Sequence, residues 1–319
     1  MQSNPTITVL MPAYNAERYI GEAIDSVLGQ TYADFEFIIV NDGSTDNTLN
    51  IIKGYSDERI IVINQSNQGV AAALNTGLKH SRAPYIARFD ADDVCYPERL
   101  EKQLQFLKNN PEYILVGSDV EYILENGDFL FNFKCIAYTH EQIVKKLYFY
   151  CPFVHPAVMY KRESILQAGG YPDNAHNFED YLLWTKLAGL GKLYNLSEPL
   201  IKYRLNSTSV TIDEKWRGKR FRYLKRKAVK RGLITQAESD EILAIIKNQD
   251  VRKIRESAYH ALCGKKFLTD NYRPQESRGH VWRAIKIYPQ RVDNYLLYLL
   301  SYLPEKLIAW MHKLSPNRL

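Results

Sequence analysis

The sequence has few cysteines and no paired cysteine motif. Its 319 residues contain four cysteines and no C-x-x-C pair. This scatter argues against a zinc site and a disulfide scaffold, and it is typical of a protein in a reducing cytosol. The four positions are Cys95, Cys135, Cys151 and Cys263.

Long apolar runs are also missing. No stretch of 18 or more uncharged apolar residues occurs, so we expect no membrane-spanning helix. Residues 1–5 carry no basic region and lead directly into a strand-like run, so no signal peptide is predicted. From these two features we expect a cytoplasmic protein.

Two nucleotide-binding motifs are missing as well. The sequence contains neither G-x-G-x-x-G nor G-x-x-x-x-G-K-[ST], so neither a dinucleotide-binding Rossmann site nor a P-loop is supported. The composition, 45% hydrophobic and 24% charged with a net charge of +6, is ordinary for a globular protein. The length fits one large domain or two ordinary ones.

Strand-like and helix-like segments alternate through the first hundred residues. The strands are nearly all apolar, which predicts a parallel sheet covered by helices on both faces. The expected strands are 6–11, 35–40, 60–63 and 85–89. Because ligands bind outside the carboxyl ends of such strands, the polar turns at Tyr14, Asp42 and 90–93 should converge at one edge.

The turn Asp90-Ala91-Asp92-Asp93 follows a buried strand and precedes a helix start at Pro97. Three carboxylates this close repel one another unless a cation holds them. A hard divalent cation with oxygen ligands, Mg²⁺ or Mn²⁺, is the natural partner. The alternative is an acidic surface turn that caps the next helix.

The pattern is mixed between residues 113 and 203. Shorter strands are expected at 114–116, 120–124 and 129–133, and an apolar strand interrupted by His155-Pro156 at 153–159. A helix opens at Phe178, with Glu179 and Asp180 in its first turn. There the helix dipole alone could explain two acidic residues.

The C-terminal part is basic and helical. Residues 215–231 contain ten basic residues and no acidic one, and helices are expected around 236–247 and 251–264. A solvated helix face, attraction to an anionic membrane surface and nucleic-acid binding are three interpretations. We expect no nucleic-acid partner, because no recognised module accompanies the run. The tail, 295–314, would lie in the membrane interface under the second interpretation.

Five motifs in order resemble those of the family 2 glycosyltransferases, which are inverting enzymes with the GT-A fold. They are Pro12-Ala13-Tyr14-Asn15, Val40-Asn41-Asp42-Gly43-Ser44-Thr45-Asp46, Asn67-Gln68-Gly69, Asp90-Ala91-Asp92-Asp93 and Glu179-Asp180. The fold class implied is α/β, a Rossmann-like, mostly parallel central sheet. The implied domains are a GT-A domain at 1–205, with a nucleotide-sugar half at 1–112 and an acceptor half at 113–205, and a basic helical region at 206–319.

The resemblance also implies a donor site for a nucleotide sugar. Asp42 would accept a hydrogen bond from the base and Tyr14 would stack on or flank it, while Arg204 could reach the diphosphate. Asn41 stands where the family usually has a first carboxylate. The full implied set is Pro12, Ala13, Tyr14, Asp42, Asn67, Gly69, Asp90, Ala91 and Arg204.

A metal site and a catalytic base are implied in the same way. Asp92 and Asp90 would hold the divalent metal, and Asp93 would contact the metal or the ribose. Asp180 would be the general base for the acceptor hydroxyl, with Glu179 as the less favoured candidate. The acceptor positions implied are His155, Tyr181 and Trp184, although for His155 and Trp184 a place in the core is an equal alternative.

The expected function is therefore sugar transfer from a nucleotide-diphosphate sugar, UDP-linked by resemblance, to a glycan or lipid-linked acceptor. Such hexosyl- or N-acetylhexosaminyltransferases serve polysaccharide and cell-envelope biosynthesis, and the protein could associate peripherally with the inner face of the membrane. One alternative is a catalytically degenerate nucleotide-sugar-binding protein. A sugar-phosphate nucleotidyltransferase is another, but Pro12-Ala13-Tyr14-Asn15 stands where its Gly-rich loop would be.

Overall fold

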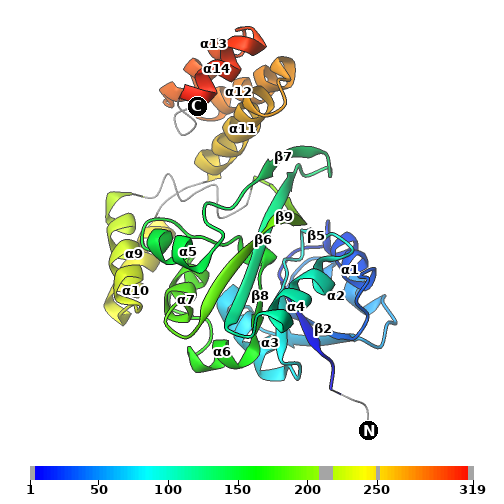
Figure 1. Ribbon diagram of the computed structural model, residues 1–319. Coiled ribbons are helices and arrows are strands. Elements are labelled where there is room, and N and C mark those ends of the chain that lie inside the picture. Colours follow the sequence, from blue (N-terminus) through cyan, green and yellow to red (C-terminus); the bar gives the residue numbers. More distant parts are fainter. Residues whose placement is uncertain (1–3, 208–217, 249–251, 315–319) are drawn as a thin grey trace. The chain divides into compact units, whose positions relative to one another are not determined.

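The computed structural model describes residues 4–207, 218–248 and 252–314. Its contacts divide the chain into two compact units, whose elements are labelled in Figure 1. Unit 1 comprises Met1–Glu121, Asn132–Tyr203 and Tyr223–Ile242, and unit 2 comprises Tyr122–Phe131, Arg204–Arg222 and Leu243–Leu319. The domain boundary expected near residue 206 remains a proposal, and the two units follow a different division of the chain.

In the described part of the chain, a nine-stranded mixed sheet has the order β3-β2-β1-β4-β8-β6-β9-β5, with β7 paired to β6. The strands are β1 Ile7–Ala13, β2 Phe35–Asp42, β3 Ile60–Gln65, β4 Tyr85–Arg88, β5 Val94–Cys95, β6 Tyr113–Ile123, β7 Phe129–Phe133, β8 Met159–Lys161 and β9 Lys192–Arg204. The α/β fold class expected from the sequence is confirmed.

The first four strands form the parallel part of the sheet. β1 pairs in parallel with β2 and β4, and β2 pairs in parallel with β3. The register places Ala13 opposite Asn41, and Asn41 opposite Asn64. The turns that follow these strands therefore leave the sheet at one edge, as predicted. Beyond β4 the pairs β4–β8, β8–β6 and β9–β5 are antiparallel.

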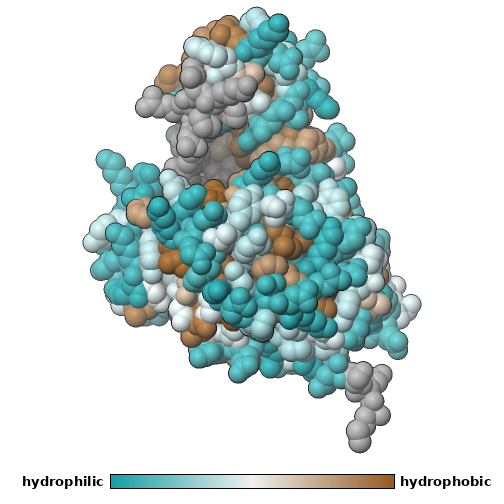
Figure 2. Space-filling view, in the orientation of Figure 1, coloured by the Kyte–Doolittle hydropathy of each residue, from teal (hydrophilic) through white to brown (hydrophobic). Residues whose placement is uncertain are grey.

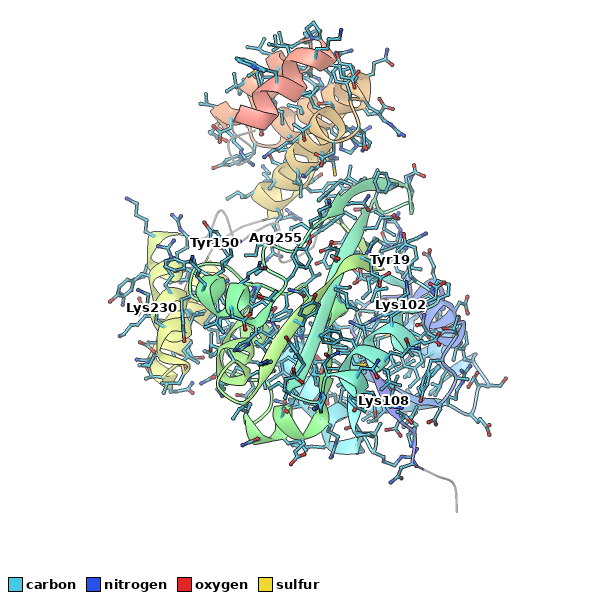
Figure 3. The ribbon with its side chains drawn as sticks, in the orientation of Figure 1. Tyr19, Lys102, Lys108, Tyr150, Lys230 and Arg255 are labelled. Carbon is cyan, nitrogen blue, oxygen red and sulfur yellow. The ribbon has the colours of Figure 1, made fainter. Side chains whose placement is uncertain are left out.

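Helices connect and cover the strands. Their bounds are α1 Ile20–Leu28, α2 Thr48–Lys53, α3 Val70–His80, α4 Arg99–Asn109, α5 His140–Leu147, α6 Arg162–Gln167, α7 Glu179–Leu187, α9 Lys219–Arg231, α10 Gln236–Asn248, α11 Arg252–Thr269, α12 Pro274–Ile287, α13 Val292–Leu300 and α14 Glu305–Leu314. Helix α3 packs on β1 and β2. Lys102 on α4, labelled in Figure 3, forms an ion pair with Glu198 on β9.

Two predicted elements differ from the structure. The strands expected at 114–116 and 120–124 are one continuous strand, β6. The strand expected at 153–159 is instead a short 3-10 turn, His155–Ala157, followed by β8. Pro156 explains the second difference, because proline has no N–H group to donate to a neighbouring strand.

Asn15 follows β1 and is of a residue type that often caps a helix, but it does not cap α1. Helix α1 begins only at Ile20 and has no side-chain cap. Asn15 has a φ angle of +48°, and its Oδ1 accepts a hydrogen bond of 2.8 Å from the backbone N–H of Thr45. Asparagine is among the residues that tolerate this left-handed conformation, so its side chain is turned toward the next polar turn.

Unit 2 contains helices α11 to α14. Helices α11 and α12 approach closely at Gly264, where an added Cβ would lie 2.4 Å from Cγ2 of Val281. Leu268, Leu300 and Ile308 form a buried cluster among these helices. No helix in the described part of the chain is long and apolar enough to cross a membrane.

Candidate active site

The turns after β1 and β2 are joined by hydrogen bonds. The backbone N–H of Asn15 donates to Oγ of Ser44 over 3.1 Å, and Thr45 donates to Asn15 as described above. Ala13 is buried and Pro12 half-buried, whereas the Tyr14 side chain is 51% exposed. The turn thus presents an aromatic ring at the sheet edge, where it is available for stacking.

Asp42 fastens the loop that precedes α3. Its Oδ1 accepts hydrogen bonds from Nε2 of Gln65 at 2.7 Å and from the backbone N–H of Gln68 at 2.9 Å. Its Oδ2 accepts one from the backbone N–H of Gly69 at 2.9 Å. A carboxylate offers about four acceptor positions, so capacity for one more donor remains, as base binding would require. Asn67 and Gly69 themselves are exposed.

Asn41 links β2 to β3 and to the turn after β2. It stands at the position where the sequence resemblance led us to expect a carboxylate. Its Nδ2 donates to Oδ1 of Asn64 on β3 over 3.0 Å, and its Oδ1 accepts from the backbone N–H of Ser44 over 3.3 Å. An amide can donate and accept at once, whereas a carboxylate only accepts. Asn41 therefore shapes the turn that carries Asp42 and Gly43.

Gly43 is the point where the turn after β2 meets the loop before α3. It has a φ angle of +71°, and a Cβ placed there would lie 2.7 Å from the backbone N of Asn67. We expect Gly43→Ala to weaken the nucleotide binding that the sequence resemblance implies at least about tenfold, because it adds the strain of a positive φ and pushes the two loops apart. Calorimetric titration with nucleotide diphosphates measures the effect.

A matched control separates the two causes. Gly169 also has a positive φ, +87°, but a Cβ there would meet no atom within 4 Å. Gly169→Ala should lower the thermal unfolding temperature through backbone strain and leave nucleotide affinity near that of the wild type. Equal affinities for the two variants would contradict the close contact as the cause.

Three carboxylates gather after β4. Asp90, Asp92 and Asp93 each offer a carboxylate oxygen, and these oxygens lie within 4.8 Å of one another. Asp93 is buried and the other two are half-buried, and the intervening Ala91 is buried, at 7% exposure. An all-oxygen, acidic donor set fits a hard divalent cation such as Mg²⁺ or Mn²⁺.

Arg88 is a buried cation directly before this cluster. Its Nη1 lies 2.5 Å from Oδ2 of Asp90, and the side chain is almost fully buried. Burial acts to lower the pKa of Arg88, but Asp90 and neighbouring groups outweigh it, and the pKa is raised. Arg88 was not singled out from the sequence. An arginine at the end of an apolar strand, two residues before an acidic turn, was the available signal.

The second acidic pair lies at the start of α7. Burial and the adjacent Asp180 raise the pKa of Glu179 to about 7, and burial raises the pKa of Asp180. The Arg88 guanidinium favours the ionised form of both carboxylates, and Asp90 acts on Glu179. The structure therefore brings the acidic groups of two distant motifs around one buried cation.

His155 lies beside this group but faces other protein side chains. Its Nε2 is 3.1 Å from the Tyr171 hydroxyl, which is 3.2 Å from the Tyr160 hydroxyl. Burial, followed by the nearby Arg88 charge, lowers the pKa of His155 well below its usual value. A neutral, hydrogen-bonded histidine fits the core alternative, and its role toward an acceptor stays a prediction.

The two aromatic acceptor candidates on α7 are in the core. Trp184 is 0% exposed and packs edge-on against Phe153 and His155, with ring centres 5.7 Å apart in each pair. The Tyr181 side chain is also buried, and its hydroxyl donates to the Leu147 carbonyl over 2.6 Å. Stacking on an acceptor sugar is thus not supported for either ring, since neither face is open.

Arg204 belongs to unit 2 and is buried. Its Nη1 donates to the carbonyl oxygens of Leu124 and Glu125, at 3.3 Å and 3.2 Å, in the turn between β6 and β7. These bonds give it a role in holding that turn. We therefore do not include Arg204 in the proposed donor site.

Comparison with known proteins places this geometry in context. Residues 8–167 match the family described as Glycosyl transferase family 2. The O-antigen biosynthesis glycosyltransferase WbnJ of Escherichia coli is 36% identical over 209 residues, covering 64% of this chain and 81% of its own. The putative glycosyltransferase EpsE of Bacillus subtilis is 36% identical over 215 residues, covering 65% and 76%.

Two solved structures share the fold. S. aureus TarS 1-349 in complex with UDP-GlcNAc has a TM-score of 0.56 at 18% identity, covering 98% of this chain and 92% of that one. The mannosyltransferase PcManGT from Pyrobaculum calidifontis, in complex with GDP-Man and Mn²⁺, has a TM-score of 0.53 at 18% identity, covering 99% and 89%.

Proposed function

The chain belongs to glycosyl transferase family 2 and is a glycosyltransferase, and we propose that it transfers a sugar from a UDP-sugar to a glycan or lipid-linked acceptor with inversion. The observation that carries the proposal is the arrangement around Arg88. Arg88 Nη1 lies 2.5 Å from Oδ2 of Asp90, and the same buried guanidinium acts on the two carboxylates at the start of α7. A candidate metal-binding group and a candidate base would thereby share one polar centre.

The residue roles follow from this arrangement. Asp90, Asp92 and Asp93 would hold a divalent metal, which when bound neutralises negative charge on a diphosphate leaving group. Asp180 would accept the proton of the acceptor hydroxyl. Tyr14 would flank the base, Asp42 would accept its N–H, and Pro12, Ala13, Asn67 and Gly69 would shape the pocket around it. UDP is proposed as the nucleotide because the similar TarS structures contain UDP and UDP-GlcNAc.

The test measures release of the nucleoside diphosphate, UDP or GDP, from a panel of UDP- and GDP-sugars in the presence of Mn²⁺, Mg²⁺ or EDTA. Metal-dependent turnover of a UDP-sugar supports the proposal and identifies the sugar. Turnover of a GDP-sugar alone overturns the choice of nucleotide. Binding without turnover in the presence of glycan and lipid-linked acceptors would favour a degenerate binding protein, and pyrophosphate release from a nucleoside triphosphate would favour a nucleotidyltransferase.

We further propose that unit 2 brings the enzyme to an anionic membrane surface where a lipid-linked acceptor would reside. Large apolar side chains recur at helical spacing on α13 and remain exposed, with Val292 76%, Leu296 60% and Leu299 65% exposed. Figure 2 shows brown, hydrophobic residues at the surface of the C-terminal helices. Residues 252–314 contain twelve Lys and Arg against five Asp and Glu, which favours a negatively charged surface.

The prediction is that the protein binds vesicles containing phosphatidylserine at low salt and binds phosphatidylcholine vesicles much less. Leu296→Asp combined with Leu299→Asp should reduce that binding about tenfold or more, since two apolar contacts become charges facing the anionic surface. Vesicle co-sedimentation measures it. Leu166→Asp, at an exposed leucine in unit 1, is the control. Equal binding by all three proteins would contradict the proposed surface.

A further inference from the structure

A second cation lies beside Asp180, and it comes from the basic run in the C-terminal part of the chain. Lys225 is on α9, beyond the residues that match the family. Its Nζ lies 5.1 Å from the ring centre of Tyr181 and 5.8 Å from that of Phe178. These two aromatic residues flank Glu179 and Asp180 in the sequence. The ammonium group therefore lies over the first turn of α7.

The environment of Lys225 differs from that of its neighbours on the helix. Arg222, Arg226 and Lys230 are exposed, as a solvated basic face would require, whereas Lys225 is half-buried. Burial lowers the pKa of Lys225, while Cys151, Asp180 and Glu179 favour its charged form. The interpretation of the whole run as a solvated face is thus wrong for this residue.

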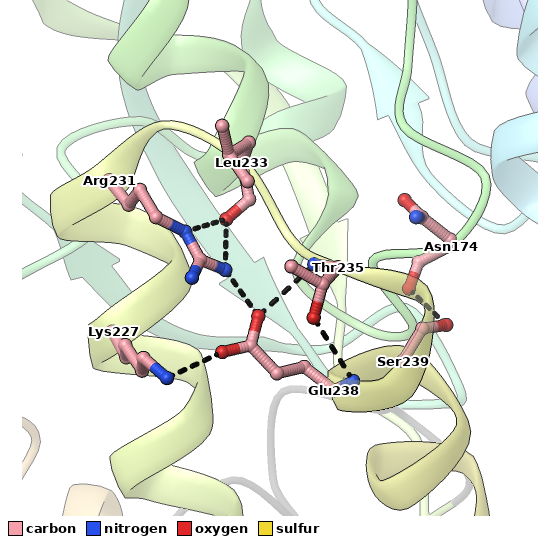
Figure 4. A network of polar contacts seen from close by, with 7 residues as sticks. All are labelled: Asn174, Lys227, Arg231, Leu233, Thr235, Glu238 and Ser239. Carbon is pink, nitrogen blue, oxygen red and sulfur yellow. Dashed lines mark hydrogen bonds and ion pairs between the residues drawn. The ribbon is translucent and has the colours of Figure 1, made fainter.

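A polar network holds α9 and α10 in place. Glu238 on α10 pairs with Lys227 at 2.9 Å and with Arg231, both on α9, and accepts from the backbone N–H of Thr235 (Figure 4). Ser239 donates to the carbonyl of Asn174, in the loop before α7, over 2.8 Å. These contacts fix the helix pair to the loop that leads into α7. Contacts within unit 1 therefore hold Lys225 in its position.

We propose that Lys225 is a positioning residue that keeps the Asp180 carboxylate ionised, so that it can act as the base. The inference rests on the proposed role of Asp180 and adds a residue from α9 to the active site. A general base must be deprotonated before it can accept a proton. Burial opposes ionisation of Asp180, and an opposite charge nearby restores it. Arg88 supplies one such charge from β4, and Lys225 supplies another from α9.

Several charged or titratable groups surround the Asp180–Lys225 pair and contribute to its titration. They are Arg88 on β4, Glu179 and Tyr181 on α7, Cys151 in the segment after α5 and Tyr171 in the loop after α6. Among these groups, together with Asp180 and Lys225 themselves, only Arg88 and Lys225 are cations. Loss of Lys225 would leave Arg88, which also pairs with Asp90, to offset the burial of both carboxylates.

The first test is the pH dependence of kcat/KM for Lys225→Met, Lys225→Arg and Lys230→Met. Lys230 is exposed on the same helix and labelled in Figure 3. Removing a cation raises the pKa of Asp180, so the acidic limb of Lys225→Met should move about one pH unit higher. Lys225→Arg and Lys230→Met should keep the wild-type limb. A purely structural role would instead lower kcat/KM at every pH without moving the limb, and this result would overturn the inference.

A second test needs no substrate. Lysine side chains are dimethylated with ¹³C-labelled methyl groups. The NMR chemical shift of the Lys225 methyl groups is then followed against pH in the wild type and in Asp180→Asn. We expect Lys225 to titrate below the usual lysine range, and lower still in Asp180→Asn because a neighbouring negative charge is gone. An unchanged Lys225 titration in Asp180→Asn overturns the inference. If Asp180→Asn keeps full turnover, it is the proposed base that fails, whatever Lys225 does.

Discussion

Replacing Asp180 with Asn should lower kcat by about 100-fold to 10,000-fold, because an amide cannot accept the proton of the acceptor hydroxyl. The substitution preserves size and removes only the charge and the basic oxygen. Asp180 Oδ1 accepts a hydrogen bond from the N–H of Tyr181 at 2.6 Å, and an amide oxygen can replace that acceptor. The affinity for the nucleotide-sugar donor should therefore change little, and the loss of activity should appear in kcat.

The measurement compares kcat and nucleotide affinity for wild type, Asp180→Asn and Glu179→Gln. Glu179→Gln removes the neighbouring carboxyl group, which burial and Asp180 bring to a pKa of about 7. Its effect on kcat should be smaller and most evident above that pH, where Glu179 would be ionised and repel Asp180. If Glu179→Gln were the inactive variant and Asp180→Asn retained turnover, the base would have to be reassigned to Glu179.

Asp92→Asn should weaken Mn²⁺ binding by more than about 100-fold and lower turnover to a similar extent. Changes in residues that only support a metal ligand cost about 10-fold to 100-fold in affinity, so loss of a ligand itself should cost more. Asp92 is half-buried, and its carboxylate oxygen lies within 4.8 Å of those of Asp90 and Asp93. An amide keeps the shape but loses the negative charge that attracts the cation.

Calorimetric titration with Mn²⁺ in the absence of donor measures the binding directly. The control is Asp128→Asn, which changes an exposed aspartate in the turn between β6 and β7 and should leave Mn²⁺ affinity unchanged. Thermal unfolding of both variants shows whether the fold is kept. Wild-type Mn²⁺ affinity in Asp92→Asn would contradict the role of this aspartate, whatever happens to turnover.

Much of the nucleotide half could be predicted because its signals are local. Near-continuous apolar strands alternate with amphipathic helices, and that pattern predicts a parallel sheet with its turns at one edge. The edge prediction needs no side-chain detail, and the register of Ala13, Asn41 and Asn64 confirms it. The acidic cluster follows from three aspartates within four residues, where the chain itself enforces proximity.

The features that were missed depend on contacts between segments far apart in sequence. For Trp184 the sequence left an acceptor role and a core place open, and its burial supports the core place, whereas Lys225 leaves an otherwise exposed basic face, which the sequence did not predict. Periodicity says which face of a helix is apolar, but not what covers it. The antiparallel pairing of the sheet could not be predicted from the sequence either. Strand β8 is only three residues long, and its pairing with β4 and β6 leaves no local sequence pattern.

The interleaving of the two units affects how such an enzyme can be recombined with its relatives. Unit 1 is completed by residues 223–242, after the chain has already contributed residues 204–222 to unit 2. A chimaera joined after residue 205 would carry the family motifs but would receive its α9 and α10, and with them the residue at position 225, from the other parent. A junction after residue 242 keeps α9 and the first half of α10 with their own α7. Crossover near 242 should therefore yield functional hybrids more often than crossover near 205.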